Sequence, residues 1–587
     1  MSNDHHERGD HQHCLTDHHD GTQHTKTSTE TQIQSSTATS QTFSSNSERS
    51  KLLPSIESPL PPSPIIPLPN DFTAFARCDW QLQHKISLHS LAPNRDSPVR
   101  TTVLRIQRQI SAQTVASRDY PLSEILAVRV AASDMLDSPV ALNDGLPVLC
   151  AGTLQKFVSS QQRHWPSVSA ATGLFLYVIH KRPRHVWRLR ELYVEFDTPE
   201  VRLRWETELA YRIVRECARP QSLLVLVNPF GGRKQAPWIF DHCVRPVLEL
   251  AGIQYTMIVT EHGDHARQLL SDPGASSIEQ FDGIVAVGGD GFFNQVLTSV
   301  LLRRQNELNI AMNCIGVCLA PPTIPVGMIP GGSSNAYATT VWGTTDPATA
   351  ALHVALGNKL WVDICAMHTG DQQRFVRFGC LCLAYGTVGY MIKMSERMRT
   401  LGPTRYQHDC PVCASADPPP EASFSTSNTP PYDCSAQERL SLLTVCVNSV
   451  RSDVSPAGVA PKSHLSDGVL TMKIVPQMSR FALLSYSLNT AFGRPDGFES
   501  VRVKRVAVTN LGTAGQESSD SYWNVDGELV VHPSGSTLHL RVHARAAPVF
   551  GFGIEPSATH CTNTCCVRRR PISTLIDEQH TLLEINQ

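Results

Sequence analysis

Apolar and polar residues alternate differently in successive parts of the chain. Within residues 71–219, short segments such as RTTVLRIQRQI and GLFLYVIHKR carry an apolar residue at every second position, and Gly, Pro, Asn or Asp bound them. This spacing is typical of half-buried β-strands. An amphipathic helix, VRLRWETELAYRIVREC, closes this part of the chain. Its apolar face is expected to carry Trp205, Leu209, Ile213 and Val214.

The pattern changes at Gln221, where fully apolar segments lead directly into glycine turns and helices. Leu223–Val227 and Ile284–Val287 are continuously apolar, which is typical of parallel strands covered on both faces. After Trp361 short strand-like segments such as LLTVCVNSV return, and we expect a β-sandwich there. The pattern therefore predicts an α/β plus β fold: an N-terminal β domain, an α/β open-sheet lobe and a β-sandwich lobe.

Both ends of the chain have compositions that do not favour a packed core. Residues 1–69 are rich in Ser, Thr, His and Gln and then in Pro, so we expect them to be disordered. The seven histidines from His5 to His24 indicate either an unstructured polar tail or a metal-binding tail. We expect residues 556–587 to be loose as well. The predicted parts are 1–69, 70–219, 220–365, 366–555 and 556–587.

Composition excludes several classes of protein. The 587 residues carry a net charge of −2, whereas a bulk nucleic-acid binder would show a basic excess, so we expect no nucleic-acid partner. The 17 cysteines are scattered, mostly in apolar segments, which indicates reduced thiols in a cytoplasmic protein. The N-terminus lacks the apolar region of a signal peptide, and no stretch approaches the roughly 18 continuous apolar residues of a spanning helix. Membrane contact is therefore expected to be peripheral.

The stretch FDGIVAVGGDGFFNQ, residues 281–295, has the pattern of a phosphate-binding turn. A buried strand leads into glycines, which let a phosphate approach closely, and a helix expected to start at Phe292 points N–H groups toward it. A tight turn with an incidental Asp290 is the alternative. Three more strand ends lead into NPFGG, TEHGD and PGGSSN. Because ligands bind at the carboxyl ends of strands in an open sheet, this convergence favours a nucleotide site.

Together the motifs NPFGG, TEHGD, VGGDGFFNQV, IPGGSSN, SERMRTLGPTRY, HLSDG and WNVDGE resemble the diacylglycerol-kinase-type catalytic domain of lipid kinases. The resemblance covers residues 221–553 and is greatest to members that phosphorylate ceramide. The strands and closing helix of residues 70–219 resemble a pleckstrin-homology domain, which those members also carry. The resemblance implies transfer of the ATP γ-phosphate to the primary hydroxyl of ceramide or a related sphingolipid, giving ceramide 1-phosphate, with Mg²⁺ or Ca²⁺ as the cation.

The resemblance also implies roles for individual residues. Asp290 would be the general base that deprotonates the lipid hydroxyl. The lipid substrate would lie against Gly288, Gly289, Asp290 and Gly291. The expected ATP contacts are Asn228, Pro229, Phe230, Thr260, Glu261, His262, Gly263, Asp264, Gln295, Gly331, Gly332, Ser333, Arg399, Arg405, Asp526, Gly527 and Glu528. Arg399 and Arg405 would hold phosphates with their guanidinium groups, with a solvated helix face as the alternative.

The chain departs from the family pattern in four places. Gln295 stands where relatives commonly have Glu, and Met394 stands where an acid is common. Only Cys410 and Cys413 remain of a CxxxCxxC element, and residues 406–439 are short and Pro-rich. Gln295 and the shortened segment leave a catalytically impaired lipid-binding relative as one alternative. A sphingosine or diacylglycerol kinase is the other, because the shared motifs specify the reaction better than the lipid.

Two further partners are considered, one from a basic cluster and one from the resemblance. Lys181, Arg182, Arg184 and Arg188 form a basic cluster that suits a phosphoinositide head group, with a solvated strand surface as the alternative. The resemblance also implies a response to calcium through calmodulin. The apolar helix expected at Ser479–Phe492 is the candidate site, although it contains a single basic residue and calmodulin targets are usually basic. We expect peripheral association with membranes such as the Golgi or plasma membrane.

Overall fold

The computed structural model describes residues 72–78, 82–91, 101–109, 115–130, 171–271, 277–397, 421–427, 434–453, 455–491, 498, 500–512 and 520–554. Every structural statement below refers to these residues. The predictions for residues 1–69 and 556–587, for Arg399 and Arg405, and for the Cys410–Cys413 element lie outside them.

The N-terminal strands form one antiparallel seven-stranded sheet with the order β4-β3-β2-β1-β7-β6-β5. Helix α2 packs Trp205, Leu209 and Ile213 into the core of this sheet. Val214 was predicted on the same face but is 69% exposed, because the next residue of a helix points about 100° away. The pleckstrin-homology identity of this region stays a prediction. The elements are β1 Phe72–Cys78, β2 Leu82–Leu91, β3 Thr101–Gln109, β4 Val115–Pro121, η1 Leu122–Glu124, β5 Ile125–Val130, β6 Gly173–Lys181, β7 Trp187–Phe196 and α2 Pro199–Glu216.

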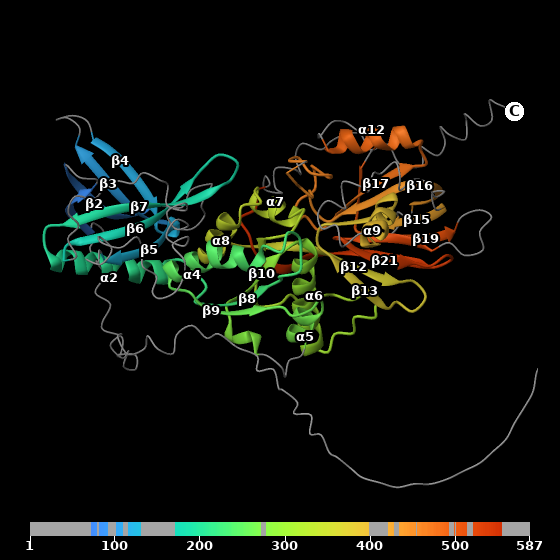
Figure 1. Ribbon diagram of the computed structural model, residues 1–587, viewed down its shortest axis with the longest axis horizontal. Helices are drawn as coiled ribbons and strands as arrows, with labels where there is room; N and C mark the ends of the chain where they lie inside the picture. Colours follow the sequence, from blue (N-terminus) through green and yellow to red (C-terminus); the bar gives the residue numbers. More distant parts are fainter. Residues whose placement is uncertain are drawn as a thin grey trace, which may run out of the picture. The chain divides into compact units, whose positions relative to one another are not determined.

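Four parallel strands in the order β9-β8-β10-β11 form the α/β region (Figure 1). Helices α4 and α8 pack together on one face of this sheet, and α5 and α6 pack together on the other. The strands are β8 Ser222–Val227, β9 Gln254–Val259, β10 Gly283–Gly288 and β11 Val326–Pro330. The helices are α3 Ala236–Ile239, η3 Phe240–Val244, α4 Arg245–Ala251, α5 His265–Ser271, η4 Ile278–Gln280, α6 Asp290–Glu307, α7 Ala336–Trp342 and α8 Pro347–Ala355.

Helix α6 begins at Asp290, two residues before the predicted start at Phe292. Gly289 is extended, with ψ of 179°, and its carbonyl already accepts the Phe293 N–H at 3.0 Å. The glycine turn is therefore shorter than predicted, and Asp290 is the first residue of the helix. This places its carboxylate in the first turn of α6, where the backbone N–H groups have no acceptor within the helix.

The last part of the described chain is rich in antiparallel strands. Strand β22 pairs with β11 in parallel and with β12 and β19 antiparallel, so it joins the α/β sheet to the second lobe. A second core is lined by strands of two sheets, including Met367, Leu443 and Trp523. The mixed α/β class with several sheets is confirmed. The elements are β12 Lys359–Thr369, β13 Phe375–Gly379, β14 Cys382–Gly386, α9 Thr387–Arg397, β15 Glu421–Ser427, β16 Cys434–Cys446, β17 Leu470–Pro476, α12 Arg480–Ala491, β18 Ser500–Val503, β19 Arg505–Gly512, β20 Ser521–Val525, β21 Glu528–His532 and β22 Thr537–Phe550.

Helix α12 occupies the segment predicted as the calmodulin candidate. It packs Leu483 and Tyr486 into a small apolar cluster, while Phe481 is 83% exposed. Within the described ranges, no helix combines the length and apolar character needed to cross a membrane.

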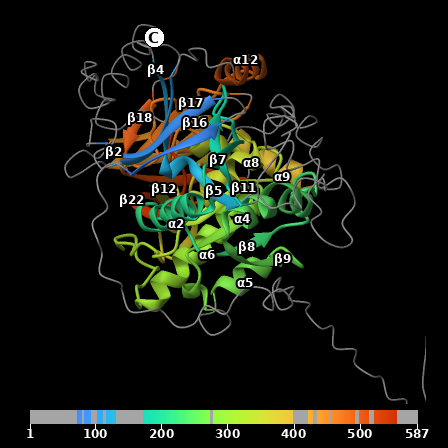
Figure 2. The ribbon, with the colours of Figure 1, turned by 90° about the vertical axis from the view of Figure 1, so that its left-hand side faces the viewer.

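The start of strand β7 contacts helix α8. Figure 2 shows the strands and helices of Figure 1 from the side. The Trp187 N–H donates to Thr349 Oγ1 at 2.9 Å, and the indole stacks on the His353 ring with centroids 3.7 Å apart. Burial in this stack lowers the pKa of His353 to about 3, so the ring is neutral. Arg188 donates to both oxygens of Asp346, at 2.7 and 3.0 Å.

These contacts revise the predicted head-group site. Arg188 is bound by Asp346, and Lys181 donates to Glu124 at 2.6 Å. Arg182 and Arg184 remain exposed at the turn. Half of the predicted basic cluster is therefore engaged within the protein, because tertiary contacts supply carboxylates that lie far away in the sequence.

We expect Arg188→Met to lower the free energy of unfolding by about 1–3 kcal/mol, because it leaves the mostly buried Asp346 carboxylate without its cation. Urea unfolding of the full chain measures this. Arg182→Met, in the turn that precedes strand β7, is the control and should change the free energy by less than about 0.5 kcal/mol. Equal effects of the two substitutions would contradict the role of the Arg188–Asp346 pair.

Candidate active site

The turns after the four parallel strands are tied to one another by backbone hydrogen bonds. Asn228 N–H donates to the Val287 carbonyl at 3.0 Å, and Gly331 N–H donates to the Gly288 carbonyl at 2.8 Å. Thr260 N–H reaches the Val227 carbonyl at 2.9 Å. The predicted convergence of NPFGG, TEHGD, GGDG and PGGSSN is therefore found in the structure.

Three of these turns touch backbone to backbone, the turn after β11 meeting both of the others. A Cβ atom on Gly332 would lie 2.4 Å from the Gly289 Cα, a distance that real side chains do not reach. Gly232, with φ of +55°, would place a Cβ atom 2.8 Å from the Gly331 carbonyl oxygen. Glycine is required at these positions because any side chain would push the turns apart.

Asparagine side chains hold the turns after β8 and β11 in shape. Asn228 Oδ1 accepts the Phe230 N–H at 2.9 Å, and Asn335 Oδ1 accepts the Gly332 N–H at 2.8 Å. Ser333 is exposed beside this turn, and the Phe230 side chain is 55% exposed. The turns therefore present polar backbone and an aromatic ring to solvent in a fixed geometry.

Asp290 lies where these turns meet. Its two carboxylate oxygens accept the N–H groups of Tyr337 and Ala336, at 2.8 and 3.1 Å. Burial raises the pKa of Asp290, these N–H groups oppose that shift, and the negative charge of Asp526 adds to it. A carboxylate has about four acceptor positions, so Asp290 keeps the capacity to accept a proton from a further hydroxyl. The contact with α7 was not predicted, because Tyr337 is 47 residues away in the chain.

Asp526 was predicted to contact ATP, but its carboxylate is directed into the protein. It accepts N–H groups from Cys380, Leu381 and Cys382, at 2.6, 3.0 and 2.8 Å. It also accepts Asn294 Nδ2 at 2.8 Å, and Asn294 lies on α6 one turn after Asp290. Asp526 therefore holds the second lobe to the helix that carries Asp290.

Glu528 is the exposed carboxylate of the same motif. Asp526 and Gly527 have φ of 52° and 93° and form the two-residue turn between β20 and β21, from which Glu528 extends. Its side chain is 45% exposed. Glu528 Oε1 would lie 3.3 Å from a Cβ atom on Gly291, beside Asp290. The turn therefore presents Glu528 to the glycine turns while it keeps Asp526 inside.

The carboxylates also limit how a metal ion would bind. Within the described ranges, no three His, Cys, Asp or Glu side chains form a metal-binding group. Asp290 and Asp526 already accept hydrogen bonds, and Glu528 Oε2 lies 3.7 Å from Arg377 Nη1, so Glu528 Oε1, the oxygen that faces Gly291, is the one that a cation would meet. This arrangement fits a cation such as Mg²⁺, which is commonly held by one or two carboxylates together with substrate phosphates.

The TEHGD turn lies at the edge of the site. Thr260 is buried, and its hydroxyl donates to the Val227 carbonyl at 3.3 Å. Glu261, His262, Gly263 and Asp264 are exposed. Gln295 Nε2 donates to the Gly263 carbonyl at 2.6 Å, so the position that departs from the family pattern contacts this turn directly.

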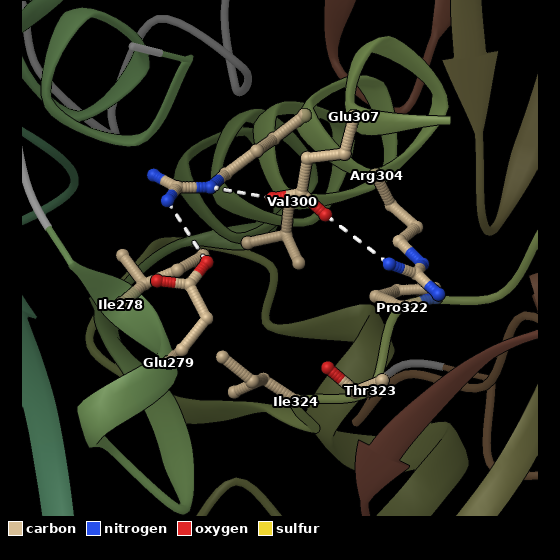
Figure 3. A pocket seen from close by; sticks show the side chains of 9 residues that line it. Ile278, Glu279, Val300, Arg304, Glu307, Pro322, Thr323 and Ile324 are labelled. Atoms are coloured by element: carbon tan, nitrogen blue, oxygen red, sulfur yellow. Dashed lines mark hydrogen bonds and ion pairs between the residues drawn. The ribbon is translucent and has the colours of Figure 1, made fainter. Parts of the chain in front are cut away.

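A small pocket at the other end of α6 does not belong to this site (Figure 3). Its charged lining is paired: Arg303 contacts Glu279 at 2.9 Å, and Arg304 contacts Glu307 at 3.3 Å. Asp290 and Glu307 are the two ends of an 18-residue helix, about 25 Å apart at 1.5 Å per residue.

We expect Asp526→Asn to lower the free energy of unfolding by about 2–4 kcal/mol, because an amide cannot accept four N–H donors and its own NH₂ group would face them. Chemical denaturation of the full chain measures this. Asp520→Asn, at an exposed position before β20, is the control and should have little effect. A stable Asp526→Asn protein would show that the carboxylate does not hold the lobes together.

Comparison with known proteins supports the assignment of the site to a kinase family. Residues 222–367 match the family described as "Diacylglycerol kinase catalytic domain". Ceramide kinase 1 of Caenorhabditis elegans is 28% identical over 428 residues, 66% of this chain and 76% of the relative. Ceramide kinase of Homo sapiens is 28% identical, covering 67% of this chain and 84% of the relative. Sphingosine kinase 2 of Homo sapiens is 35% identical, but over 198 residues, 32% of this chain and 28% of the relative. The resemblance predicted from the motifs is therefore confirmed: residues 222–367 match the diacylglycerol kinase catalytic domain, and the chain is similar to ceramide kinases over about two thirds of its length.

Proposed function

We propose that this protein is an ATP-dependent lipid kinase that transfers the γ-phosphate of ATP to the primary hydroxyl of ceramide. The observation that supports this most directly is the position of Asp290, between glycine turns whose backbones touch and beside the exposed Glu528. The N-terminal β region would be a pleckstrin-homology domain, residues 220–365 the nucleotide-binding lobe and residues 366–555 the lipid-binding lobe.

The nucleotide would lie across the turns at the carboxyl ends of β8, β9 and β11. Their glycines leave room for phosphate oxygens, and exposed groups such as Phe230 and Ser333 are available for further contacts. Arg399 and Arg405 stay in the proposal as phosphate contacts. Asp526 is not proposed to contact ATP directly, because its acceptor positions face backbone N–H groups and Asn294.

Asp290 would act as the general base. An alcohol is a poor nucleophile at neutral pH, so a carboxylate within hydrogen-bond reach assists its attack on the γ-phosphate. Burial raises the pKa of Asp290, which makes it a stronger base than an exposed aspartate. Its hydrogen bonds to α7 keep the side chain in one orientation while the lipid binds.

A divalent cation, Mg²⁺ or Ca²⁺, would neutralise charge that develops on the phosphates. Glu528 would hold it together with phosphate oxygens. We further propose peripheral membrane binding, with Arg182 and Arg184 as contacts for phosphoinositide head groups, and α12 as a calmodulin site.

The acceptor lipid is tested separately, because sphingosine kinase 2 is 35% identical over 198 residues, whereas the ceramide kinases are 28% identical over longer stretches. Radiolabelled ATP, purified full-length protein and separate ceramide, sphingosine and diacylglycerol vesicles test it. Label in ceramide is the expected result. Label only in sphingosine or diacylglycerol would overturn the acceptor assignment, and label in no lipid would favour a lipid-binding relative without activity.

We expect Asp290→Asn to lower turnover by at least about a hundredfold, because the base is lost. The fold should remain, with the free energy of unfolding reduced by about 1 kcal/mol, because the new amide can satisfy one of the two α7 N–H groups. Turnover and nucleotide affinity are measured in parallel, and affinity should stay within a few-fold of the starting protein. Near-normal turnover would show that Asp290 is not the base.

A further inference from the structure

The residue that departs most clearly from the family pattern has a defined contact. Gln295 lies on α6, five residues after Asp290, and its Nε2 atom is 2.6 Å from the Gly263 carbonyl oxygen. We propose that Gln295 is a positioning residue that fixes the TEHGD turn, residues 260–264, for nucleotide binding through this donated hydrogen bond. The proposal rests on the proposed function of the site.

The contact requires a donor at position 295. The Gly263 carbonyl oxygen can only accept a hydrogen bond, so the side-chain atom that faces it has to carry a proton. An ionised glutamate has no such proton and would place two oxygens against each other. The amide at position 295 therefore supplies the proton that this contact requires.

The turn needs this contact because its two ends are held and its middle is exposed. Thr260 is fixed to the end of β8, and on the other side the Glu261 N–H donates to His265 Nδ1 at 3.0 Å on α5. Between them His262 and Gly263 face solvent, and the His262 carbonyl accepts the His265 N–H at 3.2 Å. The hydrogen bond from Gln295 connects Gly263 to helix α6, which begins at Asp290. The same helix therefore holds both the TEHGD turn and the proposed general base.

The cation site is compatible with this role. Glu528 presents its carboxylate to the same end of α6, beside Gly291. A charged group for the cation is therefore available from another element, and position 295 is free to serve the TEHGD turn. The departure from the family pattern then changes how the turn is held and leaves the chemistry at Asp290 as proposed.

Three variants of the full chain test the proposal. Gln295→Glu keeps the shape but removes the donor, and Gln295→Met keeps the length but removes the hydrogen bond. Gln268→Glu adds the same charge on the exposed face of α5 and is the control. Hydrogen exchange of the amides of residues 261–265 is measured without nucleotide, and the dissociation constant of ADP is measured in EDTA so that a new metal ligand cannot compensate.

We expect faster exchange in the turn and ADP affinity weakened about three- to tenfold in Gln295→Met, and about tenfold or more in Gln295→Glu. The control should match the starting protein. In turnover assays the KM for ATP should rise while kcat changes little. Unchanged exchange or unchanged ADP affinity in Gln295→Glu would overturn the proposal.

A pH series separates a lost donor from a general structural effect. Glutamate has an ordinary pKa of about 4.3, and a facing carbonyl oxygen would raise it, so protonation restores a donor as the pH falls from about 8 to about 5. The ratio of dissociation constants between Gln295→Glu and the starting protein should fall toward one, whereas the ratio for Gln295→Met should stay constant. Glu261, His262, Asp264, His265 and Arg267 surround the turn in every variant, so the ratios remove their contribution. A ratio for Gln295→Glu that does not fall would overturn the proposal.

The series also separates this proposal from the function on which it rests. If the starting protein binds no ADP and labels no lipid, the proposed function fails, while the exchange measurement still reports on the Gln295 contact. If the starting protein binds ADP and the variants bind it equally well, only the role of Gln295 fails.

Discussion

The close contact between Gly289 and Gly332 is the constraint on which the candidate site depends. With backbone against backbone, the turn after β10 and the turn after β11 are close enough for α7 to begin beside Asp290. The Ala336 and Tyr337 N–H groups then bind the carboxylate and fix its direction. A side chain at either glycine would separate the turns and remove that support. A Cβ atom on Gly332 would lie 2.4 Å from the Gly289 Cα, and one on Gly289 would lie 3.0 Å from the Gly332 Cα.

A second constraint joins this site to the β-rich lobe. Two Asp-Gly pairs, Asp290-Gly291 and Asp526-Gly527, look alike in the sequence but have different surroundings. Asp290 begins a helix and keeps acceptor capacity, whereas Asp526 uses its oxygens for three backbone N–H groups and Asn294. Because Asn294 lies one helical turn after Asp290, any movement of the second lobe acts on the helix that carries the proposed base.

The N-terminal β region is packed against the α/β lobe through specific contacts. Trp187 shares a buried stack with His353, and Arg188 pairs with the Asp346 that caps α8. One apolar core contains residues of both regions, including Tyr177 and Leu352. A head-group site on this region would therefore be linked to the nucleotide lobe through the apolar core that the two regions share.

The class of fold and the chemistry of the four turns follow from the amino-acid sequence alone. Continuous apolar strands, glycines at strand ends and the aspartate between them follow from local pattern, since backbone conformation and burial depend on near neighbours. The tertiary structure decided which of the matching residues face a ligand. Asp526 is directed inward, Arg188 is neutralised by Asp346, and Gln295 supports Gly263, since each partner lies far away in the chain and is brought close only by folding.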